Sequence, residues 1–219
     1  MIRLLAYHSD PALKAATLAS LAAHRAADQI VKGQYWRKGK GCAIGCLYHS
    51  DRHDDPALGY PEWFNWLIDA VFEGLPRVDA KLWPERLAAA VPVGADIDAI
   101  KAPFLAWLML DPDNGVIRFA GERADVRAAI ERVGELWRDG GTKAEFRAAG
   151  EAARANWAAG VIGTAAAAWD AARAAGEAGA AGAAAAAWAA RAARAAAQYC
   201  AIADKIVALL KTTVVEATP

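Results

Sequence analysis

The stretch DPALKAATLASLAAHRAADQIVKG, from Asp10 to Gly33, decides the fold class of this chain. Asp10 is a residue type that caps helix N-termini, and Pro11 suits the first helical position. Leu21 and Ile30 belong to an apolar stripe along the segment, and glycine is a common residue just after a helix. The pattern therefore predicts a helix from Pro11 to near Gly33.

Similar helix signals recur through the first half of the chain. PEWFNWLIDAVFEG begins at Pro61 and has its apolar residues at helical spacing, up to Leu75. A short helix is predicted over 84–90, starting at a proline. Another is predicted for IKAPFLAWLML, with Asp98 as its cap, and DPDNG at 111–115 predicts a turn. Val116–Phe119 is only a weak strand candidate.

The composition changes at about Glu122, where the chain becomes rich in alanine, the best helix former. Asp125 is the predicted cap of one helix, and the residues from Thr142 to Glu145 form a capping box for the next. Two more helices are predicted near 162–178 and 183–211. The isolated large side chains are predicted to fill the space between closely packed helices; they are Trp137, Trp157, Trp169 and Trp188.

These patterns predict an all-α, multi-helix bundle in two parts. Residues 1–115 form a helical domain that contains the cysteines and histidines of interest, and residues 116–219 form an Ala-rich helical bundle. The two parts are expected to be packed together or linked. The Ala-rich surface leaves pairing of two copies of the chain open.

Composition narrows the classes of function. The 219 residues are 56% apolar and 23% charged, with zero formal net charge and three cysteines. A neutral chain lacks the basic balance typical of nucleic-acid binding, so we expect no nucleic-acid partner. No apolar run reaches membrane-spanning length, and no secretory signal is recognised, so a cytoplasmic location with reduced thiols is expected.

The chemistry-bearing stretch is GKGCAIGCLYHSDRH, from Gly39 to His53. Cys42, Cys46, His49 and His53 follow a C-x3-C-x2-H-x3-H spacing that suggests zinc. In one continuous helix these side chains would spread over about 16 Å at 1.5 Å per residue, too far for one ion. A zinc site therefore needs a break in the helix or ligands from other helices.

His24 and Asp28 are the other candidate ligands, four residues apart on the first predicted helix. The same residues suit an enzyme in which Cys42 or Cys46 is the nucleophile, His24 or His53 the base, and Asp28 its orienter. Cys42 follows a glycine and could begin a helix, where the dipole lowers a thiol pKa. Burial of both cysteines as small apolar residues is the structural alternative.

Two further groups of polar residues are singled out. Asp69 and Glu73 lie four apart on the helix after Pro61, and such a like-charged pair could hold a cation or an arginine, for which Arg86 is the nearest basic candidate. The loop QYWRKGKG, 34–41, carries Arg37, Lys38 and Lys40, which could contact phosphate or a base.

The segments HRAADQIVKGQYW, GKGCAIGC, GYPEWFNWLIDAVFEGLP and LWPERLAAAVPVGADI resemble a domain of uncharacterised bacterial and phage-encoded proteins, over residues 20–110. The matching positions include His24, Asp28, Cys42, Cys46 and His53. His49 is not among them, so the resemblance favours His53 over His49 in a metal or functional cluster.

RAAIERVGELWRDGGTKAEFRAAGEAARA in the second half is similar to the helical domain of immunity proteins from bacterial toxin–immunity systems. This resemblance implies a binding protein that neutralises a toxin or defence component. The leading hypothesis is thus an immunity-like or anti-defence interaction factor with a structural or zinc-bound Cys/His centre. The alternatives are the cysteine enzyme described above and a phosphate- or nucleotide-binding module.

Overall fold

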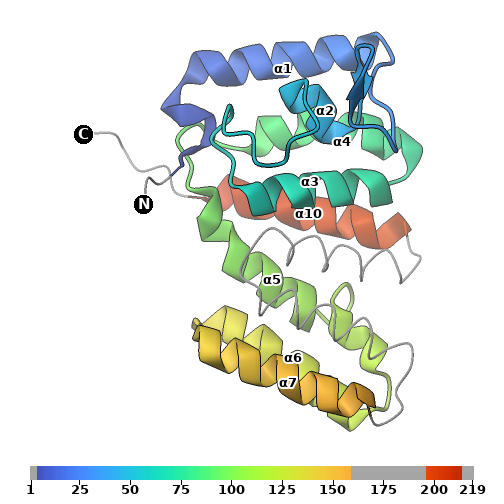
Figure 1. Cartoon of the computed structure of the whole chain (residues 1–219), viewed down its shortest axis with the longest axis vertical. Helices are drawn as coiled ribbons and strands as arrows, with labels where there is room; N and C mark the ends of the chain where they lie inside the picture. Colours follow the sequence, from blue (N-terminus) through green and yellow to red (C-terminus); the bar gives the residue numbers. More distant parts are fainter. Residues whose placement is uncertain (1–3, 159–195, 214–219) are drawn as a thin grey trace. The chain divides into compact units, whose positions relative to one another are not determined.

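The computed structural model describes residues 4–158 and 196–213, and these residues are predominantly helical (Figure 1). The α-helices are α1 (Pro11–Ala26), α2 (Ala43–Tyr48), α3 (Glu62–Gly74), α4 (Arg77–Ala90), α5 (Lys101–Leu110), α6 (Ala124–Asp139), α7 (Lys143–Ala158) and α10 (Ala196–Thr212). The 3-10 helices are η1 (Ala6–Ser9), η2 (Ile97–Ile100) and η3 (Val116–Ala120). Strands β1 (Trp36–Arg37) and β2 (Lys40–Gly41) form a small antiparallel hairpin. The predicted all-α class is confirmed, and the hairpin is the departure from it.

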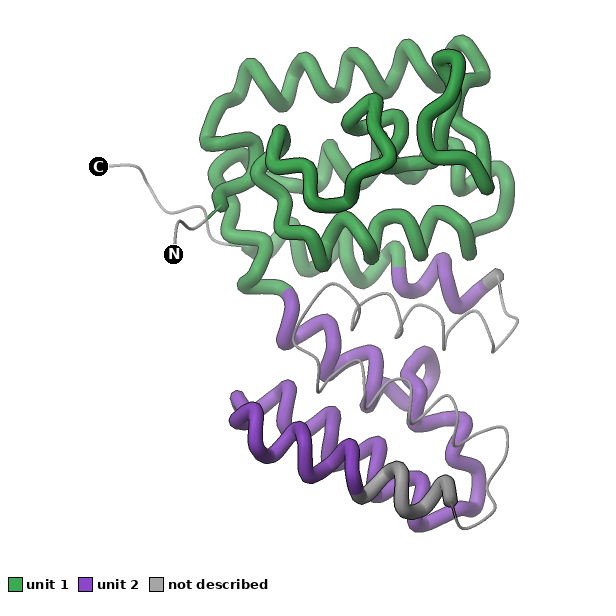
Figure 2. The backbone as a smooth tube through the Cα atoms, in the orientation of Figure 1, with its two compact units in different colours: residues 1–100, 203–219 green, residues 101–202 purple. Residues whose placement is uncertain are grey.

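The chain divides into two compact units, coloured separately in Figure 2. The first unit comprises residues 1–100 and 203–219, and the second comprises residues 101–202. The boundary therefore precedes α5 instead of following it near residue 115. The C-terminal residues from Ala203 onward belong with the N-terminal unit, a return that local sequence patterns do not reveal.

Within the first unit, α1 packs against α4, and α2 contacts α1, α3 and α4. Asp10 caps α1 as predicted, since its Oδ1 accepts a hydrogen bond from the backbone N–H of Ala12 at 2.8 Å. The helix ends at Ala26, well before Gly33, because Asp28 adopts a left-handed conformation (φ 52°). Aspartate tolerates that region better than most residues. Ile30 is consequently extended and forms a bridge beside Gly41.

Helix α3 confirms the helix predicted from Pro61, which is its N-cap. Phe64, Leu67, Ile68 and Val71 are fully buried along one face. Helix α4 begins at Arg77, seven residues earlier than predicted, and runs through Pro84. The proline thus lies inside the helix, and Pro76 is the residue that precedes the helix.

The second unit has its own apolar core, in which side chains from α5, η3, α6 and α7 meet. Thr142 and Glu145 form the predicted capping box: the Glu145 carboxylate accepts from the Thr142 backbone N–H at 2.8 Å. Helix α6 is capped at Arg123, two residues before the predicted Asp125. Val116–Phe119, the weak strand candidate, is part of the 3-10 helix η3.

Trp137 packs against Phe146, with ring centroids 4.8 Å apart, so this tryptophan does fill space between α6 and α7 as predicted. The predicted helix at 162–178 and the first part of that at 183–211 lie outside the described residues, as do the side chains of Trp157, Trp169 and Trp188. None of the described helices is long and apolar enough to cross a membrane.

Candidate functional site

The GCAIGC segment is shaped by a close approach of two backbones. A β-carbon on either Gly41 or Gly45 would lie only 1.8 Å from the carbonyl oxygen of Tyr35. The backbone N–H of Cys42 donates to the carbonyls of Gln34 and Tyr35, at 2.6 and 3.0 Å. The two glycines therefore let the β1–β2 hairpin lie directly on the start of α2, which is a packing role.

Cys42 and Cys46 are both buried, each with 1% of its surface exposed. The Cys46 thiol donates to the carbonyl oxygen of Gly41 at 3.4 Å, and burial raises the pKa of this thiol to about 11. Cys42 is the N-cap of α2, as expected for a residue after a glycine. The expected lowering of its pKa is not found: burial, followed by the nearby Asp69 carboxylate, raises the pKa of the Cys42 thiol more than the amides of Gly45 and Ile44 lower it.

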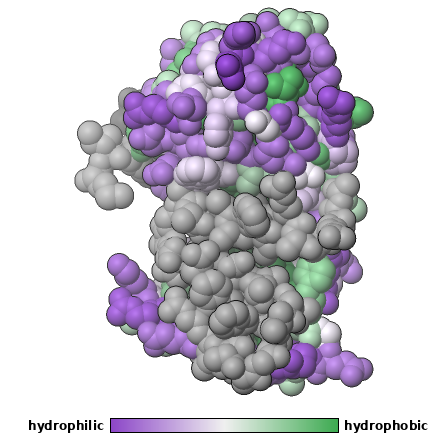
Figure 3. Space-filling model, turned by 45° about the vertical axis from the view of Figure 1, so that its right-hand side comes forward, coloured by the Kyte–Doolittle hydropathy of each residue, from purple (hydrophilic) through white to green (hydrophobic). Residues whose placement is uncertain are grey.

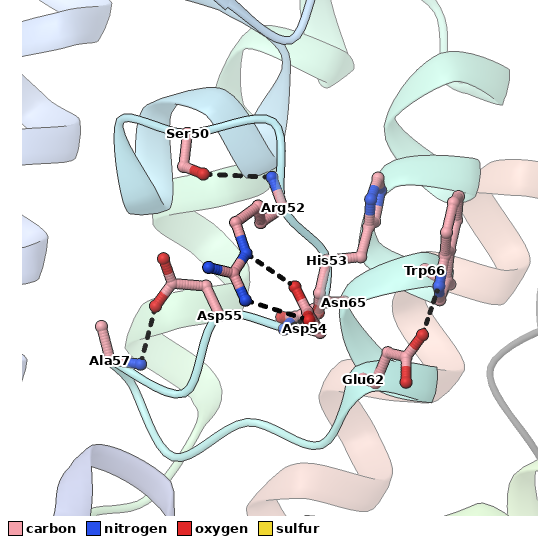
Figure 4. Close-up of polar contacts among 9 residues, drawn as sticks. All are labelled: Ser50, Arg52, His53, Asp54, Asp55, Ala57, Glu62, Asn65 and Trp66. Carbon is pink, nitrogen blue, oxygen red and sulfur yellow. Dashed lines mark hydrogen bonds and ion pairs between the residues drawn. The ribbon is translucent and has the colours of Figure 1, made fainter.

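His53 is buried against aromatic rings (Figure 4). Its imidazole lies flat on the indole of Trp66, with centroids 3.7 Å apart and planes within 3°, and Tyr35 meets it edge-on. The carbonyl of His53 accepts a 2.8 Å hydrogen bond from the side-chain amide of Asn65, which is itself fully buried. The ring is therefore held by its contacts with two aromatic rings and by the hydrogen bond to its own backbone carbonyl.

Asp69 on α3 joins Cys42 and His53 into one group, which we call the Cys42–Asp69–His53 centre. Its carboxylate interacts with the Cys42 thiol, and one carboxylate oxygen is 3.5 Å from His53 Nε2. Within the part of the chain that is described, His53 Nε2 and Asp69 Oδ1 are buried polar atoms without a hydrogen-bond partner. The centre thus contains polar groups that are close together and incompletely satisfied.

His24 lies in a different group. Its Nε2 is 2.8 Å from Nε2 of His49, the residue that follows α2, and its Nδ1 is 2.6 Å from Oε1 of Gln29. Asp28 is exposed and pairs with Lys81 of α4, which lowers the pKa of its carboxyl group. The five residues predicted as one cluster therefore have separate partners: Cys42 and His53 meet at Asp69, Cys46 bonds to Gly41, His24 to His49 and Asp28 to Lys81. Asp28 is separated from His24 because α1 ends before it.

The predicted group of Asp69, Glu73 and Arg86 is also divided. The Glu73 carboxylate accepts from the backbone N–H of Gly33 at 2.9 Å, and Arg86 pairs with Asp204. Near the C-terminus of α3 the ammonium group of Lys32 donates to the carbonyls of Glu73 and Leu75. These contacts join chain segments and do not form a common cation site.

The basic residues of the loop, Arg37, Lys38 and Lys40, lie on the exposed β1–β2 hairpin. Lys38 and Gly39 form its two-residue turn with positive φ angles of 51° and 74°, the conformation favoured in tight hairpins. The side-chain amide of Gln34 donates to the carbonyls of Arg37 and Lys40, so it closes the hairpin from within. Backbone and Gln34 hydrogen bonds hold the hairpin together. The contacts of its cationic side chains do not indicate a particular ligand.

A pocket of about 340 Å³ lies elsewhere in the first unit, between the segment after α1 and the start of α4. It is lined by Asp28, Ile30, Val31, Lys32, Phe72, Arg77, Ala80 and Lys81. The lining thus includes three cationic side chains, one carboxylate and several apolar side chains. The sequence patterns discussed above do not predict this site, although Arg77 and Lys81 are four residues apart on one helix face, a spacing that is a usable signal.

Among residues 4–158 and 196–213, no group of three or more His, Cys, Asp or Glu side chains is arranged to hold a metal ion. Comparison of the chain with protein-family models, with curated proteins and with solved structures found no match.

Proposed function

We propose that this protein acts by binding a partner and does not catalyse a reaction at its cysteines. The observation that carries the proposal is the state of Cys42 and Cys46: both thiols are buried, and the pKa of each is raised. A nucleophilic cysteine needs a thiolate and access to a substrate, and buried cysteines in apolar surroundings are inert. In this proposal the Cys42–Asp69–His53 centre has the structural role of fixing the hairpin and α2 against α3.

Thiol reactivity tests this proposal. A Cys200→Ser variant of the full chain retains only the two buried cysteines, since Cys200 is partly exposed. We expect Cys42 and Cys46 to resist alkylation by iodoacetamide at pH 7.5 and to react fully in urea. Rapid, stoichiometric alkylation of either one in the folded variant would favour the enzyme instead. Mass spectrometry of the digested protein identifies which thiol has reacted.

The surface of α4 supports a macromolecular partner. Val78 and Leu82 are four residues apart on this helix and are 73% and 46% exposed, among the few large apolar side chains exposed on the described residues. On the face drawn in Figure 3 the coloured surface is mainly hydrophilic, with isolated hydrophobic residues. Arg77 and Lys81 alternate with the apolar pair, so a partner segment with acidic and apolar residues would complement this helix.

The partner class follows from the resemblance of the second half to immunity proteins: a toxin or a defence component of the same bacterial or phage system. Its test is co-purification of the tagged chain with the products of adjacent genes. We expect a Val78→Asp, Leu82→Asp variant to lose that partner, whereas Arg147→Glu on the exposed surface of α7 retains it. Retention by both variants would exclude the α4 surface as the binding face.

The pocket favours a second candidate function, the binding of a small phosphate-bearing ligand. Among the described residues Arg77 has no carboxylate partner within ion-pair distance, and its guanidinium group suits a phosphate in bidentate geometry. Titration with inorganic phosphate and with AMP tests this, using calorimetry. We expect Arg77→Gln to weaken binding roughly tenfold or more, as for loss of a charged hydrogen bond, and Arg147→Gln to have no effect.

A further inference from the structure

Asp28 is the one acidic residue among the described residues that line the pocket beside α4. Its carboxylate pairs with the ammonium group of Lys81, another residue of the lining. The Asp28 side chain is 75% exposed and that of Lys81 is 40% exposed, and ion pairs at such exposed positions are weak. A stronger anion can therefore replace Asp28 as the partner of Lys81.

The surroundings of Asp28 already favour a negative charge. The hydrogen bond and the charge of Lys81 lower the pKa of the Asp28 carboxyl group, and the charges of Lys40 and Arg77 lower it further. Lys40 belongs to β2, whereas Arg77 and Lys81 belong to α4. Two separate elements thus direct positive charge toward the place where the carboxylate lies.

Arg77 offers hydrogen-bond donors that Asp28 does not use. It acts on the Asp28 carboxylate through its charge, without a hydrogen bond. Arg77 is the first residue of α4 and Lys81 lies four residues later, so the two side chains are neighbours on the helix surface. A guanidinium group beside an ammonium group suits a phosphate monoester, whose oxygens can accept from both and which carries up to two negative charges.

The backbone holds Asp28 in place while its side chain can turn away. Asp28 follows the end of α1 in the left-handed conformation (φ 52°), and its N–H donates to the carbonyl of Arg25 at 3.2 Å. Aspartate and asparagine adopt this conformation more readily than most other residues with side chains. Because the carboxylate is exposed, its rotation into solvent disturbs no packed group.

We propose that Asp28 is an internal competitor for the anion site of the pocket. In the free protein its carboxylate pairs with Lys81, and it leaves Lys81 when a phosphate group binds to Arg77 and Lys81. The inference rests on the phosphate-binding function proposed above and adds to it a residue that weakens the binding. A ligand binds only to the fraction of molecules in which Lys81 is released, so the apparent affinity is lower than the two cations alone would give.

Calorimetric titration of the full chain with AMP at pH 7.5 and constant ionic strength tests the proposal. We expect Asp28→Asn to tighten AMP binding by about two- to fivefold, the range that a surface ion pair provides. Asparagine keeps the left-handed backbone, so the variant removes the charge and preserves the turn. Glu85→Gln is the matched control and should bind AMP as the wild type does. Glu85 pairs with Arg25 at 2.8 Å and lies outside the pocket lining, and its loss changes the net charge equally.

A further variant separates competition for Lys81 from simple repulsion of the ligand. Lys81→Gln should weaken AMP binding, and the addition of Asp28→Asn to this variant should bring no further gain, because the two residues act as a pair. An equal gain from Asp28→Asn in both backgrounds would mean that Asp28 only repels AMP, and would overturn the proposal.

The titrations also separate this inference from the function on which it rests. If the wild type binds AMP and Asp28→Asn binds it with the same affinity, the inference is wrong and phosphate binding stands. If neither the wild type nor Asp28→Asn binds AMP, the phosphate-binding function fails, and the inference fails with it. Circular dichroism confirms that each variant is folded.

Discussion

Gly45 faces the carbonyl oxygen of Tyr35 so closely that a β-carbon there would lie 1.8 Å from that oxygen. Because the clashing atom belongs to the backbone, a side chain at this position could be accommodated only if the whole hairpin moved. This relationship explains why the second glycine of GCAIGC stands where it does. It also gives the first prediction.

Gly45→Ala should destabilise the protein by about 3 kcal/mol or more, at the upper end of overpacking effects, because the hairpin must leave α2. Gly150→Ala is the matched control, since a β-carbon at Gly150 in α7 meets nothing within 4 Å. It should stabilise the helix by roughly 0.5–1 kcal/mol. Urea unfolding of both variants measures the two free energies, and equal effects would contradict the close approach.

Asn65 is the polar residue on which the His53 loop depends. Asn65→Ala should cost about 2–4 kcal/mol, because it leaves the His53 carbonyl and the Tyr48 hydroxyl without their buried partner. Tyr48→Phe removes only one of these two hydrogen bonds and should cost about 1 kcal/mol. Thermal unfolding compares the two. A Tyr48→Phe variant as unstable as Asn65→Ala would mean that the His53 contact contributes little.

Cys46 should make the protein less stable in alkaline solution. Its pKa is raised from the usual 9.0 to about 11 by burial, so between these values the unfolded chain loses the thiol proton while the folded chain keeps it. The stability is fully present below pH 9 and falls by about 1.4 kcal/mol per pH unit for this group as the pH rises toward 11. Urea unfolding at pH 8, 9, 10 and 11 measures this slope.

The Cys46→Ala variant is the comparison for that slope. It starts from a lower stability because a packed side chain is shortened, but its unfolding free energy should fall less steeply between pH 9 and pH 11. Cys200→Ser, which alters a thiol that is only partly buried, should keep the slope of the wild type more closely. Parallel curves for the wild type and Cys46→Ala would show that other groups account for the loss.

The capping box of α7 gives a prediction confined to the second unit. Thr142→Ala removes the Oγ1 acceptor of the Glu145 backbone N–H and should cost about 1 kcal/mol. Hydrogen exchange should show faster exchange in the first turn of α7, while the amides of α1 and α4 are unaffected. An equal increase in exchange throughout the chain would contradict a local effect.

The sequence was sufficient for the helices with strong local signals. Pro61 and the apolar spacing after it correctly predicted α3, and Thr142 with Glu145 correctly predicted the start of α7. Helix boundaries were wrong where a residue type is compatible with two different backbone positions. Pro84 suits the first turn of a helix, but it lies inside α4, which begins at Arg77. Asp28 suits a helix face, yet its left-handed conformation ends α1.

The sequence identifies candidate site residues, but it does not identify which of them contact one another. The sequence singles out Cys42 and His53 but groups Asp69 with Glu73, although the Asp69 carboxylate interacts with both Cys42 and His53. His24 was matched with Asp28 because they are four residues apart, whereas it meets His49 across 25 positions of sequence. Such contacts depend on how α1, α2 and α3 pack, and spacing along one helix carries no information about that.

The discontinuous first unit has a consequence for the order in which the protein is made. Residues 203–219 belong to that unit, although the ribosome synthesises them after residues 101–202. During translation, residues 1–100 therefore emerge before the segment of α10 that carries Asp204, the partner of Arg86, has been synthesised. We expect the second unit, which is continuous, to be available for folding before the first unit, and the first unit to reach its final form only after residues 203–219 have been synthesised.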